Sequence, residues 1–202
     1  MQKKIDSVTV FGVNPDTNPK KDELKQRLDK LKEVLLTSSP KTVVFLGGES
    51  WSSNGQTYTE SGLISSVAKQ ELSQILPDDV VELPYGLETM SQTHALLDYM
   101  ETSQTDPSQM GIVTTWHQLL RSGAVFWSQG YKLPTMFPIF QAESVRDVVY
   151  DITINAFAGV GYTLLSEMLQ KNGIWTDGGP LVNKINEERT TRDKFSWFNT
   201  TK

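Results

Sequence analysis

Short apolar runs alternate with single amphipathic helices along most of the chain. Two β-prone runs, 8–11 and 42–46, flank a stretch where leucines recur at helical spacing, namely Leu24, Leu28, Leu31 and Leu35. Further helices are expected at 63–75, 89–100 and 116–129, and further strands at 80–83, 110–113 and 133–140. Strands separated by single helices pair in parallel through right-handed crossovers. The pattern therefore predicts an α/β fold, a three-layer, mostly parallel Rossmann-like sheet with helices on both faces.

Two stretches of this domain depart from the simple alternation. Pro134 and Pro138 fall within the fifth run, and because proline cannot donate to a central ladder, we expect that strand at an edge or at an irregular end of the sheet. Residues 47–59 are rich in Gly, Ser, Asn and Thr and are expected to form a loop. Structureless loops of this length in compact domains are often lids or binding loops, so this loop is a candidate for ligand contact, with a merely mobile loop as the alternative.

The end of the chain follows a different pattern. We expect residues 1–140 to form the α/β domain and residues 141–202 to form a helical and irregular extension packed on it. Gly159 and Gly161 interrupt a helical stretch at 145–170, which predicts a break there. The aromatic residues of the tail are costly to expose, so the tail is expected to pack on the domain or on a second copy of the chain; they are Trp175, Phe195, Trp197 and Phe198.

Composition excludes several classes of function. The chain has 202 residues, 19 Lys+Arg against 24 Asp+Glu, a net charge of −5, no cysteine and two histidines. Without cysteine there is no disulfide, thiolate nucleophile or Cys-based zinc site, and we assign no metal ligands. The acidic balance gives no reason to expect nucleic acid as a partner. No apolar run approaches the roughly 20 residues of a membrane helix, and the first residues are too polar for a signal peptide, so we expect a cytoplasmic protein with no membrane partner.

Ligands of open parallel sheets bind outside the carboxyl ends of the strands, where strand order reverses. The most informative of these ends is Val113-Thr114-Thr115-Trp116-His117, followed four residues later by Arg121. Thr114 and Thr115 can cap the next helix, while His117 and Arg121 share one of its faces. Together they could receive a phosphate or carboxylate, with His117 as general acid or base. A capping threonine, a histidine bonded to backbone and an arginine in a structural ion pair are the alternative.

Glycines follow the first two strands. Gly12 precedes a polar loop that contains Asn14, and Gly47-Gly48-Glu49 follows the second strand. Glycine backbone can approach a ligand closely or form an anion-binding nest, although two glycines after a strand are also an ordinary tight turn. The chain lacks both the lysine of a phosphate-binding loop and the three-glycine dinucleotide fingerprint.

Carboxylates stand at several strand-to-helix junctions. Glu49, Glu60 and Glu88 could divide acid and base roles or hold a metal through oxygen, and a glutamate in the first turn of a helix is also favoured by the helix dipole alone. Arg27 could reach over the sheet edge or extend its head to solvent. His94 is expected to be an exposed or core-edge histidine without a functional role.

The ordered set of motifs resembles the YdcF/SanA/ElyC family, a domain of unknown function. The resemblance covers about residues 5–140, and its most specific part is the Val-Thr-Thr-x-His-x-x-x-Arg segment that ends at Arg121. Its other elements are Val8 to Gly12, Arg27, Leu46-Gly47-Gly48, Glu60, Glu82 and Glu88-Thr89. The family's Ser-Gly-Gly reads Leu-Gly-Gly here, its Thr-x-Glu-Asn reads Thr89-Met90-Ser91-Gln92, and its frequent N-terminal membrane helix is absent. The resemblance implies a Rossmann-like fold with polar residues gathered at the carboxyl edge of the sheet.

These patterns favour a protein that binds a small anionic ligand, nucleotide-like or phosphate-bearing, with hydrolysis or group transfer as its chemistry. His117 and Glu60 are the candidates for proton transfer. The candidates for ligand binding are Gly12, Asn14, Arg27, Gly47, Gly48, Glu49, Glu88, Thr89, Thr114, Thr115 and Arg121. The alternative is a non-catalytic sensor of a nucleoside or S-adenosylmethionine-like molecule that uses the same pocket. The sequence names no cofactor.

Overall fold

A parallel five-stranded sheet forms the centre of the computed structural model, which describes residues 4–13, 20–48, 50–53, 56–86, 89–140, 149 and 151–172. The strands are β1 (Ser7–Phe11), β2 (Thr42–Leu46), β5 (Asp79–Leu83), β6 (Met110–Thr115) and β7 (Thr135–Ile139). Their order is β5-β2-β1-β6-β7, and every neighbouring pair is parallel. The chain moves outward from β1 to β5 and then returns to β6 on the other side of β1. The strand order therefore reverses between β1 and β6, which is where such sheets bind ligands.

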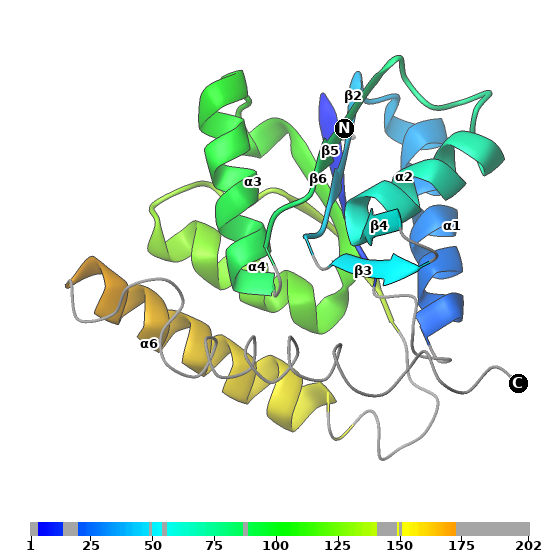
Figure 1. Cartoon of the computed structure of the whole chain (residues 1–202). Coiled ribbons are helices and arrows are strands. Elements are labelled where there is room, and N and C mark those ends of the chain that lie inside the picture. Colours follow the sequence, from blue (N-terminus) through cyan, green and yellow to red (C-terminus); the bar gives the residue numbers. More distant parts are fainter. Residues whose placement is uncertain are drawn as a thin grey trace, which may run out of the picture.

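Helices cover both faces of this sheet, as the sequence predicts. They are α1 (Lys20–Ser38), α2 (Glu60–Glu71), α3 (Thr89–Ser103) and α4 (Trp116–Ser128). Figure 1 shows α1 and α2 on one side of the strands and α3 and α4 on the other. One apolar core joins the leucine stripe of α1 and Ile64 of α2 to Val8 and Val43. A second core packs Leu96 of α3 and Leu119 of α4 on the opposite face, so the expected three-layer α/β architecture is confirmed.

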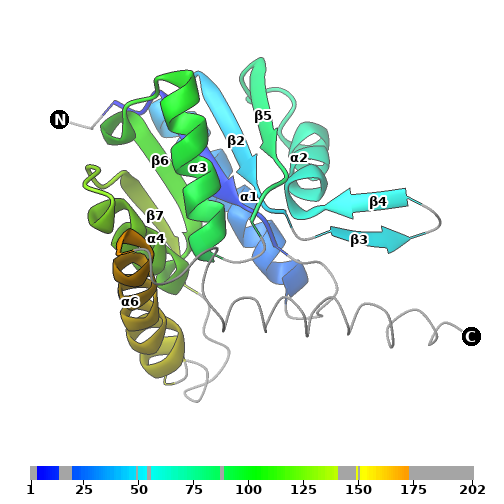
Figure 2. The same cartoon turned by 60° about the vertical axis from the view of Figure 1, so that its left-hand side comes forward.

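The expected loop at 47–59 is wrong in part, because most of it forms a β-hairpin. Strands β3 (Ser50–Ser53) and β4 (Gln56–Thr59) pair antiparallel, with Trp51 opposite Tyr58. Trp, Tyr and Thr favour strands, and the sequence between the two strands is Asn54-Gly55, the dipeptide most typical of a two-residue hairpin. The polar composition obscured this signal. The hairpin extends away from the main sheet and leads directly into α2 (Figure 2).

The remaining boundaries are close to those expected. β7 lies at the sheet edge, where Pro138 stands opposite Thr114. α2 ends at Glu71 rather than near residue 75, because Leu72 leaves the helical conformation and the backbone turns there.

A last helical segment packs on α4. It consists of a π-helical stretch, η2 (Asp151–Ala158), followed by α6 (Gly159–Lys171). The helix type thus changes at Gly159, within the stretch where the sequence predicts a break. α6 buries polar side chains, Thr163, Ser166 and Glu167, against the domain. The aromatic tail from residue 173 onward lies outside the described residues, and so does the expectation that it packs on the domain or on a second copy.

Within the ranges described above, no helix is long and apolar enough to cross a membrane.

Candidate functional site

Two glycines and a glutamate meet at the carboxyl ends of β1 and β2. Glu60 is the first residue of α2 and is 5% exposed, and the helix start is fixed by Thr59, whose hydroxyl accepts a hydrogen bond from the Gly62 amide at 3.1 Å. A Cβ atom added to Gly12 would lie 2.5 Å from the Cβ atom of Glu60, and one added to Gly47 would lie 2.7 Å from it. Such distances are far below van der Waals contact. Both positions therefore need glycine so that Glu60 can reach the sheet edge.

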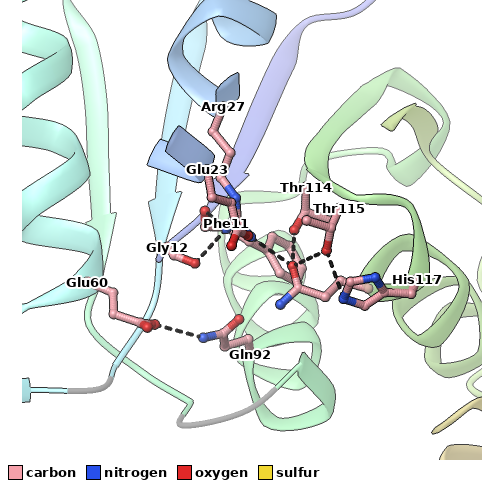
Figure 3. A network of polar contacts seen from close by, with 10 residues as sticks. Phe11, Gly12, Glu23, Arg27, Glu60, Gln92, Thr114, Thr115 and His117 are labelled. Atoms are coloured by element: carbon pink, nitrogen blue, oxygen red, sulfur yellow. Dashed lines mark hydrogen bonds and ion pairs between the residues drawn. The ribbon is translucent and has the colours of Figure 1, made fainter. Parts of the chain in front are cut away.

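The carboxylate of Glu60 is held from the other side by α3. Nε2 of Gln92 lies 3.2 Å from Oε2 of Glu60 and 3.4 Å from the carbonyl oxygen of Gly86. The Gly48 amide donates to the same carbonyl of Gly86 at 2.9 Å. The glycine turn after β2 and the start of α3 are thus linked through one acceptor, the carbonyl of Gly86. Figure 3 shows the carboxylate of Glu60 directed toward Gln92.

Arg27 reaches over the end of β1, one of the two roles that the sequence leaves open for it. Its side chain is 1% exposed, so an extension of the head to solvent is excluded. Nη1 donates to the carbonyl oxygens of Phe11 and Gly12, the latter at 2.5 Å, and Nη2 pairs with Glu23. Burial lowers the pKa of Arg27, while the charges of Glu23 and Glu60 act to raise it. Arg27 therefore closes the end of β1 and anchors the first turns of α1.

Gln118 connects Arg27 to the motif at the end of β6. Its side-chain oxygen Oε1 accepts from Nη2 of Arg27 at 2.9 Å, from the hydroxyl of Thr115 at 2.9 Å and from the hydroxyl of Thr114. These donors come from α1 and β6, and they converge at the edge of the sheet (Figure 3). The amide oxygen of Gln118 thus connects the end of β6 to Arg27 of α1, which in turn bonds the carbonyls at the end of β1.

Thr115 occupies the N-cap position of α4 but makes no side-chain cap hydrogen bond, so the expected capping role of its hydroxyl is wrong. The hydroxyl is instead taken by Gln118 and lies 3.2 Å from Nε2 of His117. The Trp116 ring stands edge-on to the His117 ring, with centroids 5.9 Å apart. His117 therefore contacts its sequence neighbours Thr115 and Trp116. It lies at one end of the set of polar side chains formed by Arg27, Gln118, Thr115 and His117.

Arg121 lies one turn beyond His117 on α4, beneath the start of α6. A Cβ atom added to Gly159 would lie 3.0 Å from Cδ of Arg121, so α6 can begin there only because Gly159 has no side chain to displace the arginine. Arg121 is half-buried. Any anion held by Arg121 would therefore be close to the junction of η2 and α6.

Three other residues singled out in the sequence, Thr89, Glu82 and His94, bond to partners outside the Arg27–Gln118–His117 set. Thr89 is buried at the start of α3, where its carbonyl accepts from Thr93. Glu82 faces α2 and accepts from Ser65 at 2.6 Å and Lys69 at 3.0 Å; burial acts to raise the pKa of Glu82, but these two donors lower it.

His94 is a core-edge histidine rather than an exposed one. Its Nε2 lies 2.6 Å from Oε1 of Glu167, a carboxyl of α6 that is 1% exposed and also accepts from Ser128 and Gln129. Burial acts to raise the pKa of Glu167, but the bond and charge of His94, together with these other donors, lower it. The cluster fixes α6 to α3 and α4.

Sequence reasoning missed three contributors to the site, Glu23, Gln92 and Gln118. Gln118 stands three residues after the N-cap Thr115, which is the spacing of a capping box, and Gln92 ends the segment in which the family resemblance breaks down. The sequence around Gln118 and Gln92 therefore contained a local pattern that could have identified them as site residues. Asn14, Glu49 and Glu88 lie outside the described residues.

In the part of the chain that the structure describes, no three His, Asp or Glu side chains converge as a metal site would require. No protein-family model, no curated protein and no solved structure matches the chain.

Proposed function

We propose that the chain binds a small anionic ligand, nucleotide-like or phosphate-bearing, at the carboxyl edge of the sheet between β1 and β6. One observation carries the proposal. Two hydrogen-bonded groups of polar side chains, Glu60 with Gln92 and Arg27 with Gln118, Thr115 and His117, flank the end of β1, the strand beside which strand order reverses. The resemblance to the YdcF/SanA/ElyC family, whose polar residues gather at this edge, supports the same location.

The residue types at this edge suit an anion. Glycine at positions 12 and 47 lets Glu60 pack against the strand ends, and Arg121 supplies a positive charge one turn from His117. Arg27 has a different role, because its Nη1 and Nη2 atoms bond to backbone carbonyls, Glu23 and Gln118. We assign Arg27 to the support of the site and Arg121 to the ligand.

Hydrolysis or group transfer is the chemistry that this arrangement supports best. His117 can exchange a proton with a bound phosphate ester or with an attacking water, and Glu60 is a second group able to do so from the β2 side. A non-catalytic sensor is the second candidate, and the contact between Gly159 and Arg121 favours it. A ligand that binds Arg121 would shift a side chain that packs against Gly159, at the junction of η2 and α6.

The first experiment is a thermal-shift screen against nucleotides, S-adenosylmethionine, and sugar and prenyl phosphates, with and without divalent cations. A ligand at 100 times its dissociation constant stabilises the fold by about 2.7 kcal/mol. The proposal expects such a ligand to raise the Tm of the wild type and to raise that of Arg121→Ala much less. Equal shifts in both proteins would place the site elsewhere.

The second experiment separates the two candidates. A His117→Gln variant keeps the size and polarity of the side chain but cannot transfer protons at neutral pH. An enzyme would retain ligand binding and lose turnover in this variant, whereas a sensor shows no turnover in the wild type.

A further inference from the structure

We infer that Gln118 determines specificity at this site by donating a hydrogen bond from Nε2 to an anionic oxygen of the ligand. The inference rests on the proposed function, and it names the amide group that recognises the anionic oxygen of the ligand.

The orientation of the amide is fixed by its three partners. Arg27 can only donate, so the atom that faces Nη2 at 2.9 Å must be the oxygen. The hydroxyls of Thr114 and Thr115 both point to that oxygen too. Because the amide is planar, Nε2 then lies on the side away from Arg27 and the two threonines.

The amide nitrogen is left available for a ligand. Among the residues that the structure describes, none accepts a hydrogen bond from Nε2 of Gln118, although the side chain is half-buried. A donor that is held in a fixed orientation and has no acceptor among the described residues is ready to pair with an acceptor from outside. Three side chains on two elements hold this donor in place, more than a simple capping glutamine would require.

The surroundings of the donor indicate which acceptor it takes. It lies at the switch point beside His117, and Arg121 is on the next turn of the same helix. A hydrogen bond from a neutral amide to an anionic oxygen adds to the charge of the arginine without the desolvation penalty of a second buried cation. The expected acceptor is therefore an anionic oxygen, which in the ligand class of the proposed function belongs to a phosphate or phosphate ester.

Gln118→Glu is the test, because a carboxylate keeps the acceptor oxygen for Arg27 and the two threonines while replacing the N–H donor by a negative oxygen. Gln109→Glu is the matched control, since Gln109 is exposed beside the amino end of β6 and acquires the same charge. Binding of AMP and of inorganic phosphate is measured by calorimetric titration, and the Tm of each variant is recorded. The two probes distinguish a nucleotide from the phosphate group alone.

We expect Gln118→Glu to keep the Tm of the wild type or exceed it and to weaken the binding of whichever probe the wild type binds by at least about tenfold. Gln109→Glu should change the affinity less than threefold. If Gln118→Glu does not fold, Gln118→Met, which removes the donor without adding charge, should still weaken binding by about threefold or more.

Other outcomes overturn the inference, and they differ from failure of the proposed function. If the wild type binds a probe, Arg121→Ala weakens that binding and the Gln118 variants do not, the site stands and the role of Gln118 is wrong. If the wild type binds neither probe, both the inference and the proposed phosphate site are overturned together.

Discussion

Nη1 of Arg27 lies 2.5 Å from the carbonyl oxygen of Gly12, so a side chain of α1 closes the end of the central strand. The same guanidinium bonds the Phe11 carbonyl, Glu23 and Gln118, and the side chain is almost completely buried. Removal of such a group leaves buried carbonyl acceptors and the partly buried carboxylate of Glu23 without their partner. Arg27 is therefore expected to be one of the most important single side chains for the stability of the fold.

We predict that Arg27→Met lowers the free energy of unfolding by about 3 kcal/mol, measured by urea denaturation followed by circular dichroism. Lys30→Met is the matched control on the same helix, because Lys30 forms only a surface pair with Glu33. Lys30→Met should lower the free energy of unfolding by less than about 1 kcal/mol. Similar losses in the two variants would contradict the role assigned to Arg27.

Two Gly→Ala changes should alter the free energy of unfolding in opposite directions. In Gly12→Ala the new methyl group would meet Glu60 at 2.5 Å, so overpacking is expected to destabilise the fold by about 1–3 kcal/mol. Gly161 lies in α6 with nothing within 4 Å of its added Cβ, and alanine there should stabilise the helix by about 0.5–1 kcal/mol. Thermal unfolding of both variants measures the difference. A stabilised Gly12→Ala protein would refute the close packing of Glu60 against β1.

The carboxyl of Glu167 should make the free energy of unfolding depend on pH in the acid range. Its pKa is lowered in the fold, so its contribution is fully present above the ordinary pKa of a glutamate and is lost as the pH falls from about 5 toward 3. In Glu167→Gln this part of the acid-induced loss of stability should disappear. The measurement is urea denaturation at pH 7, 5, 4 and 3, with the exposed Glu71→Gln as control. An unchanged acid dependence in Glu167→Gln would show that the cluster with His94 is not formed in solution.

Much of the fold could be predicted from the sequence because its signals are local and periodic. The leucine stripe of α1 and the apolar run of β2 each indicate one element, and Pro138 indicates an edge strand. The β3–β4 hairpin was missed because a polar composition was given more weight than the β-prone residues Trp51 and Tyr58.

The site could be predicted less completely, because its contacts join residues far apart in the chain. Strand ends pointed to Gly12, Gly47, Thr115 and His117, but no periodicity shows that a glutamine of α4 will meet an arginine of α1. The hydrogen bond between Arg27 and Gln118 spans 91 positions. Such a pairing depends on the strand order, which places β6 beside β1, and the strand order itself was not predicted.

The most direct test of the account is an amide NMR titration of the isotope-labelled protein with AMP. Binding at the carboxyl edge predicts the largest shift changes at the backbone amides of Gly12, Gly47, Thr115 and His117. Amides at the opposite end of the sheet, such as those of Asp79 and Met110, should change little. Shift changes concentrated instead around Lys69, Ser73 and Val80, which line a cavity of about 380 Å³ beside β5, would contradict the central claim.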